Sequence, residues 1–426
     1  MRKRILSLLL AFALVLGMVP VVASADTELY GDTNGNGTVD VYLSISDADL
    51  YMIGADSTKP MAMLPVSVPY FDLADYHLEG YYFSSESYGQ AGSGDGSALE
   101  AGTYETAYGN VTPLHLFIYA TELYQCSQAI ENPGTGELYE LGLLGSSLYE
   151  ENPDLTNPSM DACAIYISGT VGSTFLNRFW GHDENLMYFK NYEFPLASSG
   201  WGSTTDQILL KDGDIVTVGG FDDEKFYEDS TNGIFNYITA DPDTPISRIT
   251  VDAGEELNLT VMHAYESVFF PMGTQHNPVE SQPEVYYCKA DDVPSADVTD
   301  WTLLGTAESD GSITVNTEGW EAGTYIIAIA GQVGDFGSVV STPGGMLLTV
   351  TAPSAPPVVL GDVNGDTEVT AMDVSLTAQK AAGKEVTITT AAADVNGDNA
   401  ITAMDVSLIA QFAAGKITQF PTEADN

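Results

Sequence analysis

A duplicated acidic segment near the end of the chain constrains its fold more than any other feature. Residues 361–384 and 393–416 are identical at 18 of 24 aligned positions, at an offset of 32 residues. Each copy opens with oxygen-bearing side chains at alternate positions. An apolar-spaced stretch follows and ends at a glycine, the usual residue just past a helix. The sequence therefore predicts one loop–helix unit present twice.

The spacing of oxygen atoms in each copy is that of a calcium loop. Ca²⁺ takes roughly six to eight oxygen ligands, which a tight loop supplies from alternate positions and from its twelfth residue. The predicted ligands are Asp362, Asn364, Asp366, Glu368, Thr370 and Asp373 in the first copy, and Asp394, Asn396, Asp398, Ala400, Thr402 and Asp405 in the second. Glu368 and Ala400 would offer main-chain carbonyls, and Thr370 and Thr402 would act through a water. The alternative, two Asn/Asp/Gly turns without an ion, does not explain why the spacing repeats in register.

Two half EF-hands of this kind, with Asp rather than Glu at the twelfth position, resemble a type I dockerin domain over residues 360–420. The resemblance implies two bound calcium ions. It also implies a partner, the cohesin module of a scaffold or cell-surface protein, as in a cellulosome. It places the partner-facing surface at loop positions ten and eleven, here Ala371 and Met372 in one copy and Ala403 and Met404 in the other. The alternative is that the two methionines pack between the helices.

The sixth loop position departs from the usual pattern. A sharp turn there normally requires glycine, but the two copies carry Thr367 and Asn399. Asparagine tolerates a left-handed backbone, whereas a β-branched threonine does so poorly. The first loop is therefore expected to bind calcium more weakly than the second.

Residues 1–25 look like a secretory signal peptide. Basic residues at positions 2–4 precede an apolar run over residues 5–19 that is too short to span a membrane, and small residues at 23–25 form a cleavage site. We therefore expect a mature protein that begins at Asp26. It would be secreted and either extracellular or attached to the cell surface through a partner.

The charge balance excludes two classes of partner. The chain has 13 Lys+Arg and 60 Asp+Glu, a net charge of −47, and removing the three signal cations gives 10 − 60 = −50. Nucleic acid and anionic membranes would be repelled, and calcium would be attracted. The three cysteines, Cys126, Cys163 and Cys288, allow a disulfide between the first two or leave buried free thiols.

Residues 26–60 contain a weaker version of the same loop. Its twelfth position falls on Leu43, which cannot bind a cation, unless residues 42–45 are an insertion that brings in Asp47. The ligands of this degenerate dockerin-like unit, and of a third calcium ion, would then be Asp32, Asn34, Asn36 and Asp47. The alternative is an Asn-Gly turn with no ion.

Residues 66–235 are aromatic-rich and predict a mixed domain. Thr112 and Pro113 mark the start of a helix with one apolar face, and residues 211–214 predict the turn of a strand hairpin. Residues 160–222 resemble the C-terminal domain of transcobalamin, which implies a small, ubiquitin-like β module with a binding role.

Residues 246–352 alternate in short apolar strands and predict a β-sandwich. The segment Ala322–Tyr325 resembles the tyrosine corner of bacterial immunoglobulin-like domains. Residues 353–359 are a proline-rich, stiff linker. The predicted fold class is mainly β and multidomain, with a ubiquitin-like or mixed β module, an immunoglobulin-like sandwich and then a small α-helical calcium-binding dockerin.

The best-supported function is calcium-dependent docking of a secreted modular protein that presents β-rich binding domains. Because dockerins are commonly joined to polysaccharide-degrading enzymes, the first alternative is a glycoside hydrolase of polysaccharide catabolism, with its catalytic domain in residues 66–235. A glycosidase needs two carboxylates beside its sugar, and 60 acidic residues do not identify that pair. His182, beside Asp183, is more often a structural donor than a catalyst. The second alternative is an adhesin whose middle domains bind a polysaccharide or other surface ligand.

Overall fold

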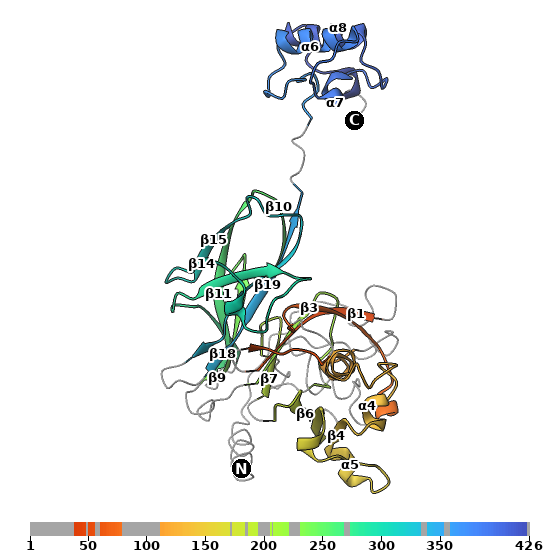
Figure 1. The fold of residues 1–426 in the computed structure, drawn as a ribbon, viewed down its shortest axis with the longest axis vertical. Coiled ribbons are helices and arrows are strands. Elements are labelled where there is room, and N and C mark those ends of the chain that lie inside the picture. Colours follow the sequence, from red (N-terminus) through yellow and green to blue (C-terminus); the bar gives the residue numbers. More distant parts are fainter. Residues whose placement is uncertain are drawn as a thin grey trace, which may run out of the picture. The chain divides into compact units, whose positions relative to one another are not determined.

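The computed structural model divides the chain into two compact units, residues 1–351 and residues 352–426. The described residues are 38–47, 50–55, 60–78, 111–170, 173–183, 186–194, 205–206, 208–220, 231–267, 273–333, 339–352 and 358–423. Within these ranges the first unit is mainly β-structure and the second is helical (Figure 1). No helix among the described residues is long and apolar enough to cross a membrane.

The first domain of the first unit is built on a sheet around β1 (Thr38–Asp47). β1 pairs antiparallel with β2 (Leu50–Tyr51) and β3 (Leu64–Pro69). It pairs in parallel with β8 (Ile215–Gly220), and β8 pairs antiparallel with β7 (Leu186–Lys190). Residues about 170 positions apart in the sequence thus form neighbouring strands, for example Tyr42 and Ile215.

The predicted dockerin-like unit at residues 26–60 is wrong in its second half. A dockerin unit places a helix after its loop, but Thr38–Asp47 is a strand. Its apolar residues alternate with a period of two, which suits a strand and not a helix. Those residues, all 0–1% exposed, are Val39, Val41, Leu43 and Ile45. Asp47 Oδ1 lies 2.9 Å from His182 Nε2, and Asp32, Asn34 and Asn36 lie outside the described residues.

The helix predicted at Thr112 and Pro113 is confirmed as α3 (Pro113–Ala120), which continues into a π-helical turn, η3 (Thr121–Gln125). The Thr112 backbone N–H donates to His115 Nδ1 at 3.2 Å and closes the cap. Nearly every residue of α3 is buried. The helix therefore packs on most of its sides and not on the one predicted apolar face alone. The other elements of this domain are η1 (Leu73–Tyr76), α4 (Glu137–Glu140), α5 (Ser147–Glu151), η4 (Met160–Ala162) and a sheet of β4 (Leu144–Ser146), β5 (Ile165–Thr170) and β6 (Ser173–Phe179).

The hairpin predicted around residues 211–214 is wrong, because the residues before this turn form no strand with β8. The turn instead attaches to β1. Gly213 N–H donates to the Asp40 carbonyl at 2.7 Å, and Asp40 N–H donates to Asp212 Oδ1 at 2.9 Å. A partner so distant in the sequence could not be predicted from local turn chemistry.

The second domain is a sandwich of two sheets (Figure 1). The strand order of one sheet is β10 (Arg248–Asp252), β19 (Gly344–Thr351), β16 (Gly323–Ile329), β13 (Glu284–Lys289) and β14 (Thr302–Thr306). The order of the other sheet is β12 (Gly273–Pro278), β11 (Glu256–Ser267), β9 (Thr231–Thr239), β18 (Val339–Thr342) and β17 (Gln332–Val333). In this sheet β15 (Ser312–Asn316) also pairs with β11. The short helix η5 (Val298–Asp300) lies between β13 and β14 in the sequence. β9 belongs to this domain, so the predicted boundaries at 235 and 246 fall too late.

The tyrosine corner predicted at Ala322–Tyr325 is present. The Tyr325 hydroxyl donates to the Glu321 carbonyl at 2.9 Å, and its ring is 4% exposed. A tyrosine that bonds to the backbone a few residues upstream is the defining feature of this corner. The bond fixes the chain where it enters β16.

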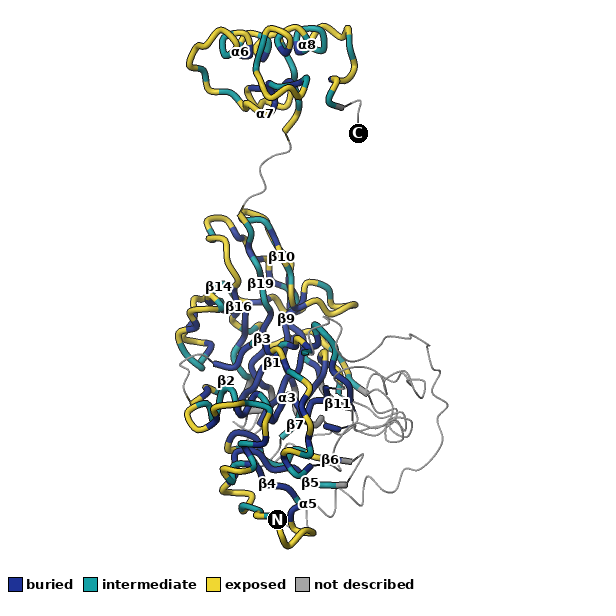
Figure 2. Tube along the Cα trace, turned by 90° about the vertical axis from the view of Figure 1, so that its right-hand side faces the viewer, coloured by how far each residue is buried: buried dark blue, intermediate teal, exposed yellow. Residues whose placement is uncertain are grey.

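The two domains of the first unit share buried apolar side chains, and Figure 2 shows how much of both is buried. We call this boundary the seam. Tyr51 of β2 stacks on Trp301 of the sandwich with ring centroids 6.2 Å apart. The Tyr51 backbone N–H donates to the Ala296 carbonyl at 3.2 Å. Its hydroxyl is buried and has no hydrogen-bond partner among the described residues.

We expect Tyr51→Ala to lower the free energy of unfolding of the first unit by about 3–5 kcal/mol, because it leaves a cavity at the seam. Tyr51→Phe keeps the ring and removes a buried hydroxyl without a partner, so it should be neutral or stabilising. Urea unfolding followed by tryptophan fluorescence measures both. A Tyr51→Phe variant as unstable as Tyr51→Ala would mean that the hydroxyl, rather than the ring, holds the seam.

The second unit contains α6 (Ala371–Ala381), α7 (Thr390–Ala393), α8 (Ala403–Ala413) and η6 (Pro421–Glu423). Gly383 and Gly415 follow the two long helices with φ of 77° and 64°, as predicted. A hydrogen bond joins the residues that precede the two loops, because Gly361 N–H donates to the Ala392 carbonyl at 2.8 Å. A small core lies beneath both loops and contains Val363, Ala392, Ala393, Val395, Ile409 and Phe420.

Candidate calcium and docking site

The first loop gathers three of its predicted ligands. Asp362, Asp366 and Asp373 each place a carboxylate oxygen within 4.8 Å of the other two. Asp362 also shapes the loop, because its Oδ1 accepts from Gly365 N–H at 2.8 Å and its Oδ2 from Thr367 N–H at 2.8 Å. Three carboxylates held this close repel one another unless a cation lies between them.

Asp373 has a second role that the sequence analysis missed. It forms a capping box with Thr370, whose N–H and hydroxyl donate to Asp373 Oδ2 at 2.8 and 3.0 Å. Burial alone would raise the pKa of Asp373, but hydrogen bonds from Thr370, Val363 and Asn364 hold it below its usual value. The signal was available, since a threonine three residues before an acid marks a helix start.

The second loop repeats these contacts almost one for one. Asp394 accepts from Gly397 and Asn399 N–H at 2.9 and 2.8 Å. Asp405 Oδ2 accepts from Thr402 N–H at 2.8 Å, but Asp405 Oδ1 is buried and has no partner among the described residues. An orphaned buried carboxylate oxygen is costly; the equivalent oxygen of the first loop, Asp373 Oδ1, accepts from Val363 and Asn364 N–H at 2.9 and 3.2 Å.

Asn364 and Asn396 lie at equivalent places in the two loops, and each donates from Nδ2 to the next loop acid, Asp366 or Asp398. Glu368 and Ala400 donate their N–H groups to the same two acids. Thr370 and Thr402 serve as the helix N-caps. The donor set is rich in hard oxygen atoms and contains no sulfur or imidazole, which fits calcium.

The sixth loop position is left-handed in both copies, as the sequence analysis expected. Thr367 has φ of 75° and Asn399 has φ of 65°. A left-handed conformation costs a residue with a side chain roughly 1–2 kcal/mol, and a β-branched one most. Thr367 therefore carries the greater backbone strain.

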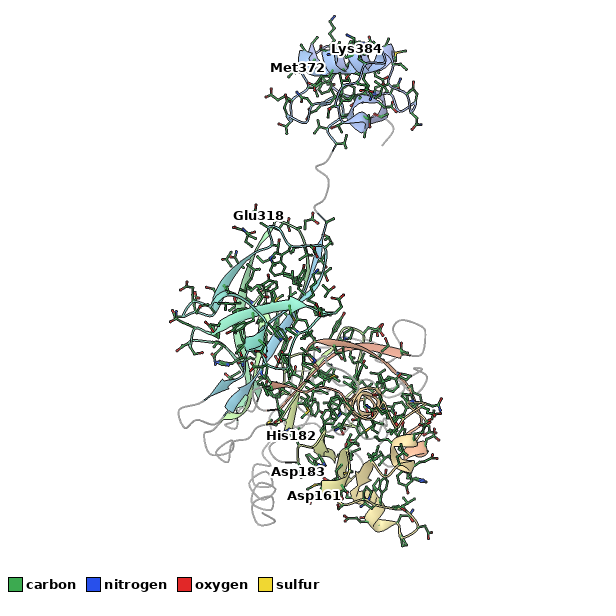
Figure 3. The ribbon with its side chains drawn as sticks, viewed as in Figure 1. Asp161, His182, Asp183, Glu318, Met372 and Lys384 are labelled. Carbon is green, nitrogen blue, oxygen red and sulfur yellow. The ribbon has the colours of Figure 1, made fainter. Side chains whose placement is uncertain are left out.

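The four predicted partner-facing residues lie on the first turns of α6 and α8 and are all exposed. Met372, which is labelled in Figure 3, is 59% exposed, and Met404 is 60% exposed. The alternative, in which both methionines pack between the helices, is therefore wrong. Because the two methionines are almost equally exposed, the domain presents two equivalent apolar side chains to solvent.

The end of the chain also supports the first loop, which the sequence analysis did not foresee. Phe420 is 1% exposed and stacks on Phe412 with ring centroids 4.6 Å apart. A Cβ at Gly361 would come within 2.8 Å of the Phe420 ring, so only glycine fits there. The symmetry of the two copies is thus broken beside the first loop.

The candidate catalytic groups of the first unit are structural where they are described. Burial raises the pKa of Glu122, as in a glycosidase acid. Its side chain, however, is 0% exposed and accepts from the Tyr76 hydroxyl at 2.9 Å and from Gly134 N–H at 2.7 Å. Burial lowers the pKa of His115 and of His263 to about 4, because the charged imidazolium is disfavoured away from water. Asp183 forms an ion pair with Arg178.

The aromatic residues between 180 and 201 could stack on a sugar only if they were exposed, and those that are described are core residues. Trp180 is 8% exposed and Tyr192 is 4% exposed, and the Tyr188 hydroxyl is buried. Trp201 lies outside the described residues. Cys126, Cys163 and Cys288 are free thiols, so the first two form no disulfide.

Comparison with known proteins identifies the second unit. Residues 360–412 match the dockerin type I domain family, which confirms the resemblance. No curated protein matches the chain. Among solved structures, the chain is similar to the N-terminal four Ig domains of Dscam1 isoforms 4.44 and 6.9, at 16% and 18% identity and TM-scores of 0.15 and 0.16. These matches cover 32% and 33% of this chain and only 23% and 24% of those chains.

The chain therefore carries a type I dockerin domain, and dockerin domains bind calcium and dock onto cohesin modules. Its predicted fold class, mainly β with a helical C-terminal dockerin, is confirmed.

Removing calcium should unfold the second unit, because the carboxylates of its loops then repel one another and ion binding contributes directly to folding. We expect chelation to abolish most of the helical circular dichroism of a fragment spanning residues 352–426. A fragment spanning residues 26–351 is the control and should change little. Identical spectra of the dockerin fragment with and without chelator would contradict the calcium assignment.

The two loops should respond differently to glycine at the sixth position. Thr367→Gly relieves the larger strain and should raise the calcium affinity of the first loop by several-fold, in line with roughly 1 kcal/mol. Asn399→Gly should change the second loop by less. Titration calorimetry resolves the two sites, and equal affinities that neither substitution alters would refute the backbone explanation.

Proposed function

We propose that this chain is a secreted protein that is anchored by its calcium-loaded dockerin to a cohesin of a scaffold or cell-surface protein. The observation that supports this most directly is the paired, exposed Ala–Met surface above two calcium loops, on a unit that matches the type I dockerin family. The signal-like residues 1–25 lie outside the described residues and support secretion by their sequence alone.

In this proposal each loop holds one calcium ion. The first site uses Asp362, Asp366 and Asp373 together with Asn364, and the second uses the equivalent residues. Calcium supplies the positive charge that offsets the repulsion between the carboxylates. Because Asp373 is both a ligand and the cap of α6, ion binding fixes the first turn of the helix that presents Met372.

Two orientations of the dockerin on its partner follow from the repeat. A rotation of about 180° that exchanges α6 and α8 places Met404 where Met372 was, and both helices continue with the same Val-Ser-Leu sequence. Two bound states whose free energies differ by less than about RT are both populated. Small and apolar contact residues favour a contact driven by apolar burial. Lys380 in one copy stands where Phe412 stands in the other, which would bias the choice.

The first unit is proposed to bind a ligand. A polysaccharide-degrading enzyme is the alternative, and reducing-sugar release by residues 26–351 from a panel of polysaccharides separates the two. Release would support hydrolysis, and binding without release would support an adhesin.

The two-orientation model predicts a specific pattern of losses. Ala371→Asp with Met372→Asp should leave much of the cohesin affinity, and so should Ala403→Asp with Met404→Asp. The combined four-residue change should abolish binding, because neither copy then offers an apolar surface. Surface plasmon resonance against a cohesin found by pull-down measures this.

Thr418→Asp is the matched control for this series, since it adds charge to an exposed position of the same unit away from both pairs. Calcium uptake must be retained in every variant. Complete loss of binding from one pair alone would show that the domain docks in a single orientation.

A further inference from the structure

A small pocket lies at the seam of the first unit. Its volume is about 250 Å³. One wall is formed by Asn191, Tyr192, Gly213 and Ile215 of the first domain, and the other by residues 245–248 of the sandwich, at the end of the β9–β10 connection. We call it the seam pocket. It is smaller than the roughly 300–1,000 Å³ of sites for drug-sized ligands, so it suits a single small ring.

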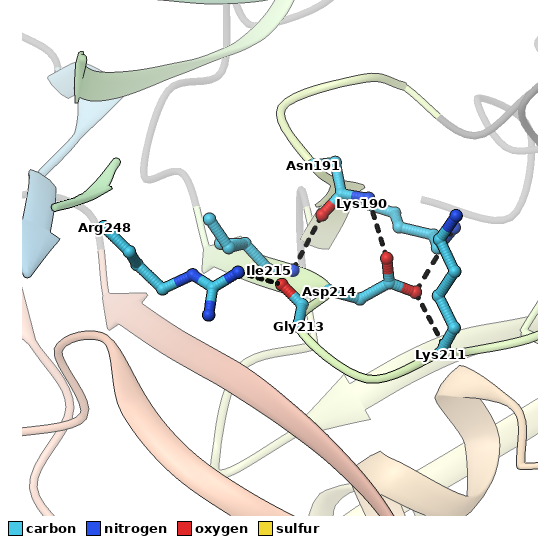
Figure 4. Close-up of polar contacts among 7 residues, drawn as sticks. All are labelled: Lys190, Asn191, Lys211, Gly213, Asp214, Ile215 and Arg248. Carbon is cyan, nitrogen blue, oxygen red and sulfur yellow. Dashed lines mark hydrogen bonds and ion pairs between the residues drawn. The ribbon is translucent and has the colours of Figure 1, made fainter. Parts of the chain in front are cut away.

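The Asn191–Tyr192 turn is strained, and a polar network holds it in place. Asn191 has φ of 51° and Tyr192 has φ of 65°, at two consecutive positions that favour glycine. Asn191 Nδ2 donates to Asp214 Oδ1 at 2.8 Å, and Ile215 N–H donates to Asn191 Oδ1 at 2.8 Å (Figure 4). Strain that the surrounding structure maintains in this way is typical of functional sites.

The charge of this network is balanced internally. Lys190 Nζ lies 3.3 Å from Asp214 Oδ2, and these side chains are 8% and 2% exposed. Lys211 N–H also donates to Asp214 Oδ2, at 2.9 Å. Asp214 is therefore satisfied, and it does not neutralise any other cation at the pocket.

Arg248 is the charged residue of the pocket wall. It donates from Nη2 to the Gly213 carbonyl at 3.1 Å, and its guanidinium lies 4.4 Å from the centre of the Tyr42 ring. No described carboxylate forms an ion pair with it. Its ring contact and its hydrogen bond, both to uncharged groups, leave the guanidinium charge without a carboxylate among the described residues. A guanidinium has five N–H donors, and the Gly213 carbonyl uses one.

A second polar group lies in the same wall. The Tyr192 hydroxyl is buried and makes no hydrogen bond of ordinary length among the described residues, although the Ser247 hydroxyl lies near enough to lower its pKa slightly; Tyr192 is 4% exposed. Its ring stacks on Tyr237 with centroids 4.2 Å apart, so it cannot turn away easily. Burial raises the pKa of Tyr192 to about 12, so the hydroxyl keeps its proton at neutral pH. The neighbouring Ser247 hydroxyl donates to the Ile238 carbonyl at 2.5 Å and keeps lone pairs free to accept.

We propose that the seam pocket binds a carboxylate-bearing sugar ring, such as a uronic acid residue. Arg248 would take the carboxylate through its remaining N–H donors, an arrangement that a planar guanidinium favours. Tyr192 and Ser247 would meet ring hydroxyls, and Pro245 and Ile246 would cover an apolar face of the ring. A net charge of −47 repels polyphosphates and nucleic acid more strongly than it repels a ligand with a single carboxylate. The proposal concerns the first unit and does not depend on docking through the dockerin.

The test is titration of the full chain with methyl glucuronide, with methyl glucoside as the neutral match, by calorimetry or chemical-shift perturbation. We expect the glucuronide to bind at least about tenfold more tightly than the glucoside, as a charge-assisted hydrogen bond would provide. Arg248→Gln should remove this preference. Tyr192→Phe, which keeps the ring and its stack, should weaken glucuronide binding by several-fold.

Lys289→Gln is the matched control, because it removes a cation of the same unit whose Nζ pairs with Glu321 instead. It should leave binding unchanged. Thermal unfolding of each variant shows whether the seam is intact, and Tyr192→Phe tests the pocket even if Arg248→Gln loosens it. The proposal is overturned if the glucuronide does not bind at millimolar concentration. Equal binding of the glucoside, or full affinity in the Arg248→Gln and Tyr192→Phe variants, would also overturn it.

Discussion

The second unit depends on the acidic side chains of its two short loops, which converge in the first loop and leave a buried oxygen without a partner in the second. Asp362, Asp366 and Asp373 meet within 4.8 Å, and Asp405 keeps a buried oxygen without a partner. Backbone N–H groups satisfy part of this charge, but none of them is a cation. Asp373 and Asp405 also complete the capping boxes of α6 and α8, so these loop acids help to determine where the two helices begin. In the proposed calcium-loaded dockerin, folding, ion binding and presentation of the docking surface are one coupled event.

The first unit depends on a different principle, the burial of apolar side chains between two β domains. Tyr51 enters the sandwich side of the seam, and Tyr192 stacks on Tyr237 across it. Burial on this scale makes independent movement of the two domains costly. It also brings the strained Asn191–Tyr192 turn close to Arg248, which forms no ion pair with a described carboxylate. Each domain supplies one wall of the seam pocket, so the pocket forms only where the two domains meet.

The two units differ in the surfaces that they present, and a different role is proposed for each. The dockerin repeats one small surface twice, and its helices leave Met372 and Met404 open to a partner. The first unit offers no described acid that is both exposed and tuned like a glycosidase catalyst, since Glu122, whose raised pKa has that character, is closed off by Tyr76 and Gly134. The proposed ligand binding by a docked protein does not depend on such an acid.

Features that depend on local spacing could be predicted from the sequence. The acidic loops, their glycine-ended helices, the tyrosine corner and the start of α3 each rest on residues a few positions apart, so their signals lie within one short window. The pairing of Thr38–Asp47 with Ile215–Gly220, and the pocket that Tyr192 and Arg248 share, became evident only in the three-dimensional fold. Those contacts join residues tens to more than a hundred positions apart. Their register is set by burial of whole faces, which no local pattern specifies.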